Sequence, residues 1–559
     1  MPITWLFATR AAAAALVLVA SGAAPAAAQR FLPDDPVWRD RDDLPIPEPR
    51  EIELSSGYDV IKHSLGHRPG KGKIPRAQNL NTLGEVPDST WWTNRIGIHP
   101  MSTAELARGP NVGDGPDLTR PWTVVRGKSG GITPGFTIRD ERGDLYFIKF
   151  DPERYFGMST GADVIGSKFF HAFGYFVPTN WIVYLPREIL RIAPDAKVRV
   201  RGGPPRLMTT SDLELALERV ARLSDGRIRA VASRAVPGRV IGPNEYYGTR
   251  SDDPNDVIPH EHRRELRGYR LFSAWLNHDD SRSHNSLATY VTTPRGGHLV
   301  HYLQDFASIL GSGSDWRRQI APQNPRAGNE YLLELAPTLK TALSFGLWER
   351  PWFRIRYEVH PQVGAIEALH FDPDRWRPEY PNPAFERMRP EDAFWAARII
   401  SKFTEEGVRA IVAEADLRAP LAEAHLVRVI MERRRRVLAR HLGLLNPLAD
   451  FRVTRGSDAA QLEFVNHGED AGLRVVEAYE GQWFAFDNAS GATAALGSPT
   501  RTRTRAVPVP AGQHPYLMAR IRSSAPGVEN WMRRVDVFVR TQGGPLVVGI
   551  DRETEEDLR

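Results

Sequence analysis

The sequence predicts an α+β protein with a strand-rich half, a mainly helical half and a C-terminal all-β sandwich. Three observations lead to this prediction. Residues 122–150 read as three short strands separated by glycine-containing turns, whereas residues 392–415 and 421–444 repeat apolar side chains at helical spacing. Beyond residue 448 the apolar period drops to two, in short segments separated by Gly, Asn and Pro. The 559 residues allow two or three domains of ordinary size.

Residues 1–28 have the composition of a secretory signal peptide. Arg10 precedes an apolar core, and an alanine triplet at residues 26–28 forms an Ala-x-Ala site, so we expect cleavage before Gln29. The alternative, an uncleaved anchor, needs about 20 strongly apolar residues, and this core is short and mostly alanine. We therefore expect a periplasmic or secreted protein that has no transmembrane span once the signal is removed.

Composition excludes some classes of partner. The net charge is +5 and the isoelectric point is near 9.3, but acidic residues are interleaved with the basic ones. The sharpest basic run, residues 433–436, lies in a helix-like segment, and basic and aromatic residues do not alternate as they do in proteins that bind single-stranded nucleic acid. We therefore expect no nucleic-acid partner. The sequence contains no cysteine, and a chain of this length can bury a large core without disulfides.

Residues 29–115 form an N-terminal extension rich in Pro, Gly and Asp. Its weak periodicity predicts loops and short elements that wrap over the body. Trp91 and Trp92 lie at its densest point, and we expect both rings to anchor the extension to a core rather than to contact a ligand.

The strand-rich half carries a glycine loop followed by a lysine. The loop consists of Gly127, Lys128, Ser129, Gly130 and Gly131. The third strand, residues 145–150, contains Lys149 as its one charge among apolar neighbours. A glycine loop alone is a weak signal for a binding site, whereas a glycine loop, a hairpin and a strand lysine in this order are a stronger one.

A helix is predicted after these strands, at residues 160–173, because apolar residues recur there at helical spacing before Gly174. Asp163 lies near its start. From its position alone, its carboxylate can complement the helix dipole. Residues 181–185 are predicted to form the last strand of this half.

The residues that can carry chemistry are concentrated between residues 271 and 311. An apolar helix leads into a polar loop with Asp280, Arg282 and Asn285, and a predicted hairpin then ends at Asp305. The hairpin is expected to bring Asn285 and Asp305 to one end of a sheet. Phosphoryl transfer needs a carboxylate that orients the acceptor hydroxyl, here Asp280, and oxygen ligands for Mg²⁺, here Asn285 and Asp305. The competing interpretation is an ordinary polar helix end and an exposed hairpin.

The order of these residues resembles that of the protein-kinase-like fold, nearer to the atypical HipA-type and secretory-pathway kinases than to eukaryotic protein kinases. Asp280 and Asn285 have the spacing D-x-x-x-x-N of a kinase catalytic loop, and residues 305–307 read D-F-A where kinases have D-F-G. The resemblance covers residues 122–448, and the layout is similar to that of a family of exported bacterial proteins. The resemblance gives Asp163 a second role of about equal weight, which is to pair with Lys149 and orient it. Four departures are Ala307 in place of glycine, Asp163 in place of the usual glutamate, the long interval between Asn285 and Asp305, and the lack of an A-P-E motif.

This resemblance implies a bilobal kinase-like body with a β-rich N-lobe at residues 116–190 and a mainly helical C-lobe at residues 191–448. It also implies ATP and a divalent cation, Mg²⁺ or Mn²⁺, as cofactors. The implied cofactor-binding residues are Gly127, Ser129, Gly130, Gly131, Lys149 and Asp163, the implied metal ligands are Asn285 and Asp305, and the implied catalytic residues are Asp280 and Arg282. The β-sandwich, residues 449–559, is expected to support the helical lobe.

Two functions from different classes are consistent with the sequence. The first is an exported kinase-like phosphotransferase that uses ATP and a divalent metal, with a protein, a glycan or a small molecule as acceptor. The alternative is a catalytically inactive kinase-fold protein that binds or scaffolds partners in the cell envelope. The sequence has a residue for each polar role in a kinase site, which favours the first function. Free ATP is scarce outside the cytoplasm, which favours the second.

Overall fold

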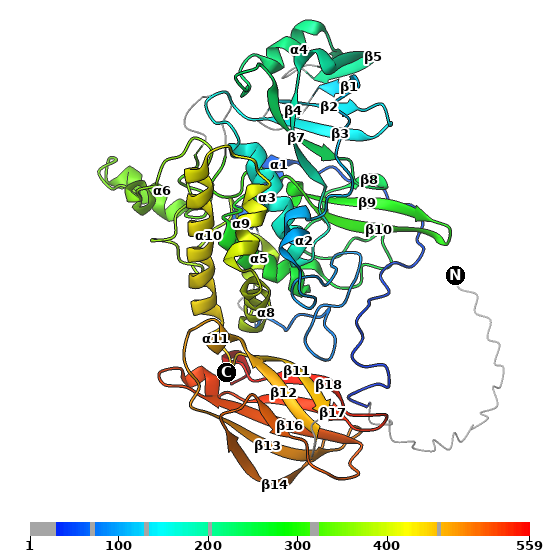
Figure 1. Ribbon diagram of the computed structural model, residues 1–559, viewed down its shortest axis with the longest axis vertical. Helices are drawn as coiled ribbons and strands as arrows, with labels where there is room; N and C mark the ends of the chain where they lie inside the picture. The colour runs from blue at the N-terminus through cyan, green and yellow to red at the C-terminus, as the bar shows by residue number, and fades with distance from the viewer. Residues whose placement is uncertain are drawn as a thin grey trace, which may run out of the picture.

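The computed structural model describes residues 29–66, 73–127, 134–199, 204–313, 323–455 and 460–558. These residues form an α+β protein, which confirms the predicted fold class. A seven-stranded sheet lies at one end of the long axis, helices lie in the middle and a β-sandwich lies at the other end (Figure 1). The predicted signal peptide, residues 1–28, lies outside the described residues, as do Ser129, Gly130 and Gly131 of the glycine loop.

The seven-stranded sheet is larger than the sequence pattern predicted. Its strands are β1 (Trp122–Gly127), β2 (Gly135–Arg139), β3 (Leu145–Phe150), β4 (Asn180–Leu185), β5 (Leu190–Arg199), β6 (Pro205–Leu207) and β7 (Ile228–Arg234). The spatial order is β4-β7-β3-β2-β1-β5-β6. Because β7 lies between β4 and β3, the chain leaves this sheet only after Arg234, and the boundary expected at residue 190 falls inside the sheet.

Alternation along β3 separates the two faces of this sheet. Tyr146, Ile148 and Phe150 are buried in a core that the sheet shares with α4 (Thr210–Leu217). Lys149 points to the opposite face, where its ammonium reaches α3 (Met158–Phe173). The period of two that defines a strand therefore places the lysine on the face that carries the candidate site.

The start of α3 is tied to the sheet by a buried carboxylate. The N-cap residue Gly157 has φ 86° and offers no side chain for capping. Asp151, directly after β3, accepts hydrogen bonds from the backbone N–H groups of Gly157, Ser159 and Thr160, each at 2.9 Å. Arg229 of β7 donates to the same carboxylate at 3.2 Å, and both side chains are fully buried. Asp151 therefore caps the helix from outside it.

The helical part contains the largest core. Its helices are α5 (Arg264–Leu276), α6 (Leu335–Leu343), α7 (Pro383–Glu386), α8 (Pro390–Ser401), α9 (Glu405–Ala413) and α10 (Pro420–His441). Residues 392–415, predicted as one helix, are split between α8 and α9, because the Thr404 side chain accepts from the Gly407 N–H at 3.1 Å and starts a new helix. In the described parts of the chain, no helix combines the length and apolar character of a membrane span.

A three-stranded sheet lies between the seven-stranded sheet and the sandwich in Figure 1. It consists of β8 (Arg239–Gly242), β9 (Ser286–Thr293) and β10 (Gly296–Leu303), in the order β10-β9-β8. The β9–β10 hairpin pairs Ser286 with Leu303. This register brings the residue before β9 and the residues after β10 to the same end of the hairpin.

The β-sandwich consists of two sheets that pack face to face. Its strands are β11 (Leu448–Arg455), β12 (Ala460–Asn466), β13 (Ala478–Phe486), β14 (Thr493–Thr502), β15 (Ala506–Pro508), β16 (Tyr516–Ser524), β17 (Val535–Arg540) and β18 (Leu546–Arg552), with short helices α11 (His467–Asp470) and α12 (Glu555–Leu558). The sheet orders are β11-β12-β15 and β14-β13-β16-β17-β18. Leu462, Trp483 and Val537 share the core between them.

The N-terminal extension runs along the molecule from the sandwich to the helical part (Figure 1). It contains α1 (Ser56–Ile61), the π-helical turn Lys62–Gly66 and α2 (Thr103–Arg108). Phe31 is buried among the aromatic residues of the sandwich, and Ile46 forms a β-bridge with β10. Trp91 and Trp92 are buried, which confirms their predicted role as anchors.

Candidate functional site

Lys149 of β3 lies between two carboxylates from distant parts of the chain. Its Nζ donates to Oδ2 of Asp163 on α3 at 3.0 Å and to Oδ1 of Asp305, two residues after β10, at 2.7 Å. The side chain of Asp163 is 2% exposed, whereas that of Asp305 is 47% exposed. These three residues, the Lys149 cluster, are therefore enclosed on the helix side and open to solvent on the Asp305 side.

The charges of the Lys149 cluster do not cancel. Burial opposes the charge of Lys149, but Asp163 and Asp305 outweigh burial, so the pKa of Lys149 is raised. Burial raises the pKa of Asp163, and the Lys149 ammonium opposes that rise. Counted by themselves and with both carboxylates ionised, these three groups carry one more negative than positive charge.

Asp163 is fixed by backbone and side-chain donors. Its Oδ1 accepts from the Phe306 N–H at 3.0 Å and from Nδ2 of Asn180 at 3.4 Å. Helix α3 begins at Met158 and has no acidic residue in its first turn. Since the helix dipole acts mainly on the first turn, the position of Asp163 is explained by its pairing with Lys149 and Phe306.

Asp305 lies in a tight turn that also positions Asn285. Its φ is 59°, in the left-handed region that residues with a Cβ rarely adopt. The neighbouring Gln304 N–H donates to the Asn285 carbonyl oxygen at 2.9 Å. The hairpin therefore brings Asn285 and Asp305 together, and the unusual backbone of Asp305 is the kind of local strain that concentrates at functional sites.

Aromatic rings pack around Phe306, the residue after Asp305 in this turn. The ring of Phe306 is fully buried and stacks on Phe170 of α3, with centroids 4.8 Å apart. The His278 ring lies 5.6 Å from Phe306, and burial lowers the pKa of His278 to about 3. The imidazole is therefore neutral at physiological pH and acts here as a packing group. In kinases the packing of the Phe of D-F-G sets the state of the site.

The loop between α5 and β9 holds the remaining predicted residues. Arg282 lies with its Nε 2.5 Å from Oδ1 of Asp280, and its Nη1 donates to Oε2 of Glu379 at 2.9 Å. Nδ2 of Asn285 donates to the carbonyl oxygen of Asp280 at 2.7 Å. This hydrogen bond fixes the Asn285 amide, whose oxygen is the atom that can ligate a metal ion.

Carboxylates in this loop have raised pKa values. Burial raises the pKa of Asp279 to about 8, and the nearby charge of Glu379 adds to the effect. Burial and Glu379 also raise the pKa of Asp280 well above its ordinary range, while Arg282 opposes the rise. Once ionised, Asp280 is therefore a stronger base than an exposed aspartate.

The glycine loop connects β1 to β2, and β2 is the strand that pairs with the lysine strand β3. Gly127 pairs with Phe136, and the next residue toward the loop, Gly135, pairs with Lys149. A Cβ on Gly127 would lie 3.0 Å from the side chain of Val198, so a larger residue would crowd β5. The first residue of β2 after the loop, Gly135, is therefore next to Lys149, whereas Gly127 lies one strand further away.

Sequence reasoning missed two acidic residues near the loop between α5 and β9. Glu379 binds Arg282 from 97 positions away in the chain. Asp59 of α1 accepts from the Tyr380 hydroxyl at 2.5 Å, which brings the N-terminal extension against the same region. No local pattern signals such pairs, because the partners lie far apart in sequence.

Comparisons with protein-family models, with curated proteins and with solved structures found no match to this chain. Function is therefore inferred from the residues of this chain alone.

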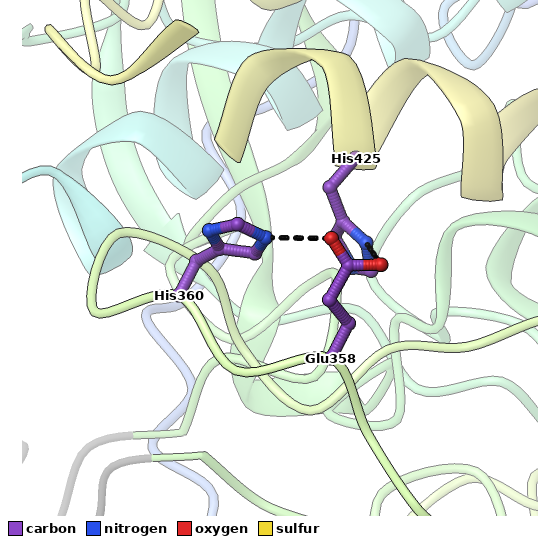
Figure 2. A group of neighbouring side chains, drawn as sticks. All are labelled: Glu358, His360 and His425. Atoms are coloured by element: carbon purple, nitrogen blue, oxygen red, sulfur yellow. Dashed lines mark hydrogen bonds and ion pairs between the residues drawn. The ribbon is translucent and has the colours of Figure 1, made fainter. Parts of the chain in front are cut away.

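A second group of possible metal ligands comes from other elements. Glu358 and His360 lie in the loop after α6, and His425 lies on α10 (Figure 2). One ligand atom from each lies within 4.8 Å of the other two. Among the described residues, this is the one group of at least three His, Cys, Asp or Glu side chains that meets this distance. The sequence did not indicate it, because 65 positions separate His360 from His425.

Proposed function

We propose that this protein is an exported kinase-like phosphotransferase that uses ATP and a divalent metal ion. The observation that carries the proposal is the Lys149 cluster. A strand lysine contacts a helix carboxylate at 3.0 Å and the carboxylate of a D-F-A turn at 2.7 Å. In phosphotransferases of the kinase kind, a strand lysine paired with a helix acid holds the nucleotide phosphates, and the aspartate of D-F-G holds the metal.

The donor set fits Mg²⁺ or Mn²⁺ with a nucleotide. Asn285 and Asp305 offer an amide and a carboxylate oxygen at the same end of the hairpin, and hard divalent cations prefer oxygen ligands. When bound, the metal would neutralise charge on the phosphates. Lys149 would hold the phosphates, and Asp163 would keep the lysine oriented, since its other oxygen is already held by the Phe306 N–H.

Asp280 is proposed to orient the acceptor hydroxyl. Its carboxylate is held by Arg282, and Arg282 is held in turn by Glu379. The raised pKa of Asp280, caused first by burial and next by Glu379, makes its carboxylate a stronger base than that of an exposed aspartate, as a group that takes up a proton requires. Arg282 is proposed to position Asp280 and to keep part of it ionised.

Nucleotide binding tests this proposal directly. Thermal unfolding of the chain from Gln29 onward is measured with and without ATP plus Mg²⁺ or Mn²⁺, for the wild type and for the Lys149→Ala and Asp305→Ala variants. ATP with metal is expected to raise the wild-type Tm, because a ligand at 100 times its Kd stabilises by about 2.7 kcal/mol. Asp305→Ala should lose the part of the Tm increase that depends on metal. Lys149→Ala should lose most of the Tm increase that ATP and metal produce together.

The matched control is Arg206→Ala, which removes an ion pair between β6 of the same sheet and Asp212 of α4. This variant should respond to ATP and metal as the wild type does. A wild-type Tm that neither nucleotide nor metal changes would reject the proposal.

One observation favours the alternative of an inactive kinase-fold scaffold. Ala307 follows Phe306 where kinases have glycine, so the turn lacks the backbone freedom that glycine gives. The Asp280→Asn variant distinguishes the two functions. A phosphotransferase should keep its nucleotide-dependent Tm shift in this variant and lose transfer of labelled phosphate, whereas a scaffold should show no transfer in either protein.

A further inference from the structure

The loop that follows α6 is held against α10 by three side chains with metal-ligating atoms. Nε2 of His360 lies 3.0 Å from Oε1 of Glu358, and Nδ1 of His425 lies 3.2 Å from Oε2 of the same carboxylate (Figure 2). The two imidazole rings are 5.1 Å apart between centroids. One carboxylate thus lies between two imidazole nitrogens, and all three groups turn toward a common point.

The hydrogen bonds around His425 leave a mismatch. Nη2 of Arg428 lies 3.0 Å from Nδ1 of His425, and arginine can only donate, so Nδ1 accepts there and carries no proton. The Glu358 oxygen near the same nitrogen is also an acceptor, so no proton lies between them. Among the described residues, Nε2 of His425 has no hydrogen-bond partner although the side chain is only 3% exposed. The guanidinium of Arg428 is the cation that His425 Nδ1 and the Glu358 carboxylate share here, so a metal ion at this point would displace it.

We propose that Glu358, His360 and His425 bind a divalent transition-metal ion, with Zn²⁺ as the first candidate. Two imidazoles and one carboxylate form a donor set that Zn²⁺ accepts, with water in a fourth position. Imidazole nitrogens select Zn²⁺, Ni²⁺ or Cu²⁺ over Mg²⁺ and Ca²⁺. This site is separate from the all-oxygen site of Asn285 and Asp305 and does not depend on the proposed phosphotransfer.

The position of the loop gives the metal a structural role. Nε2 of Gln323 donates to the carbonyl oxygens of His360 at 3.1 Å and Val363 at 2.9 Å, and the Ala365 N–H donates to the Gly311 carbonyl oxygen at 2.9 Å. The loop therefore packs against the segment that continues from the Asp305 turn. A metal ion that joins the loop to α10 holds this segment in place.

Zinc titration of the whole chain from Gln29 tests the site. The protein is stripped with a chelator, and zinc binding is measured by competition with a chromogenic chelator and by Tm. We expect one zinc per chain at this site and a raised Tm. His360→Ala should weaken binding by about 100-fold or more, since even outer-shell partners cost about 10–100-fold. Mg²⁺ at millimolar concentration should not compete.

Two further variants sharpen the result. Arg428→Ala removes the guanidinium that contacts both Glu358 and His425, so its zinc affinity should rise several-fold. His370→Ala is the matched control: His370 is an exposed histidine 3.4 Å from Glu367, and its loss should leave zinc binding unchanged.

Because His425 is buried, the test relies on the variants at positions 360, 428 and 370, all of which have more exposed side chains. Absence of zinc binding by the wild type would overturn the proposal. So would equal zinc affinity in the wild type and His360→Ala.

Discussion

Two ionic clusters lie at the same end of β3, two residues apart, and they differ in how completely the protein satisfies them. Asp151 accepts from three backbone N–H groups and from Arg229, and both side chains are fully buried. Lys149 also binds carboxylates directly, but one of them, Asp305, is 47% exposed. The first cluster is closed by the protein on every side, and the second has an open side.

This difference separates stability from binding. Arg229 also donates to the Asp416 carbonyl oxygen at 2.7 Å, so the Asp151 cluster joins β3, α3, β7 and the segment after α9. The Asp151 carboxylate and the Arg229 guanidinium both bind groups of the protein itself. The Lys149 cluster includes the carboxylate of Asp305, which is 47% exposed, so a change there need not disturb the core. The following substitutions test this contrast.

The largest effect is expected for Asp151→Ala. The substitution removes the cap of α3 and leaves the Arg229 guanidinium buried without its carboxylate, which typically costs about 3–5 kcal/mol. Urea unfolding followed by circular dichroism measures the loss. Asp225→Ala, which removes an exposed aspartate paired with Arg227, should leave the midpoint nearly unchanged. Similar losses in the two variants would contradict the role of the closed cluster.

A pH-dependent effect is expected for Asp279→Asn. The pKa of Asp279 is about 8 in the folded protein, mainly through burial, and close to 4 in an unfolded chain. Between these values the folded state binds more protons, so the free energy of unfolding falls as pH rises from 4 to 8. The asparagine cannot titrate, so the variant should gain stability relative to the wild type across this window, on the order of a few kcal/mol.

Urea unfolding at pH 5 and pH 8 measures this difference. Asp225→Asn serves as the reference, because its pKa is lowered and it stays ionised over the whole range. An equal change in the free energy of unfolding between pH 5 and pH 8 in the wild type and in Asp279→Asn would show that Asp279 is ionised in the native state.

A smaller loss is expected for Asp305→Asn in the absence of ligand. Lys149 keeps its partner Asp163, and the lost carboxylate is about half exposed, so the cost should be about 1 kcal/mol or less. The same variant should lose the metal-dependent Tm shift. A loss as large as that of Asp151→Ala would place Asp305 among the structural residues instead.

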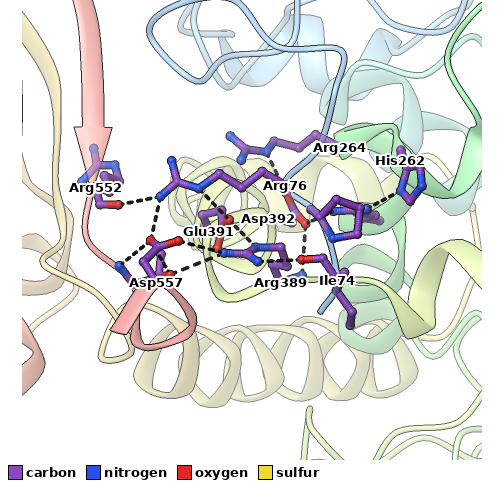
Figure 3. Close-up of polar contacts among 12 residues, drawn as sticks. Ile74, Arg76, His262, Arg264, Arg389, Glu391, Asp392, Arg552 and Asp557 are labelled. Atoms are coloured by element: carbon purple, nitrogen blue, oxygen red, sulfur yellow. Dashed lines mark hydrogen bonds and ion pairs between the residues drawn. The ribbon is translucent and has the colours of Figure 1, made fainter. Parts of the chain in front are cut away.

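The smallest effect is expected for Arg76→Ala. Arg76 of the N-terminal extension pairs with Asp557 of α12 at 2.7 Å and with Asp551 at 3.2 Å (Figure 3), but 48% of its side chain is exposed. Exposed pairs contribute about 1 kcal/mol or less, and salt screens them. The Tm difference from the wild type should therefore be small at low salt and disappear in 1 M NaCl. A difference that persists in salt would mean that the stem of Arg76 contributes through packing.

Local patterns in the sequence were sufficient for much of the candidate site. A single charge in the apolar strand β3 identified Lys149, helical spacing located α3 with Asp163, and a short turn between two strands predicted that Asn285 and Asp305 approach each other. Each of these inferences uses contacts between residues close in sequence or joined by one turn. Such contacts follow from backbone geometry alone.

Contacts between residues far apart in sequence could not be predicted in the same way. β7 joins the sheet between β4 and β3 after an insertion that contains β5, β6 and α4, and nothing in its own composition specifies those neighbours. β14 was missed because it is an exposed edge strand without apolar alternation. The ligand group at Glu358 and His425 depends on tertiary packing, because one residue lies in a loop and the other on a helix.

The N-terminal extension has a consequence for how the chain reaches its native state. The Phe31 N–H donates to the side chain of Asn488, 457 positions later, and the Ile550 N–H donates to the Thr82 carbonyl oxygen at 2.9 Å. At about 5–20 residues per second, a ribosome needs roughly half a minute to a minute and a half to make that interval. Throughout this time Phe31 has no native partner, so a chain halted before β17 exposes an aromatic surface that the finished molecule buries.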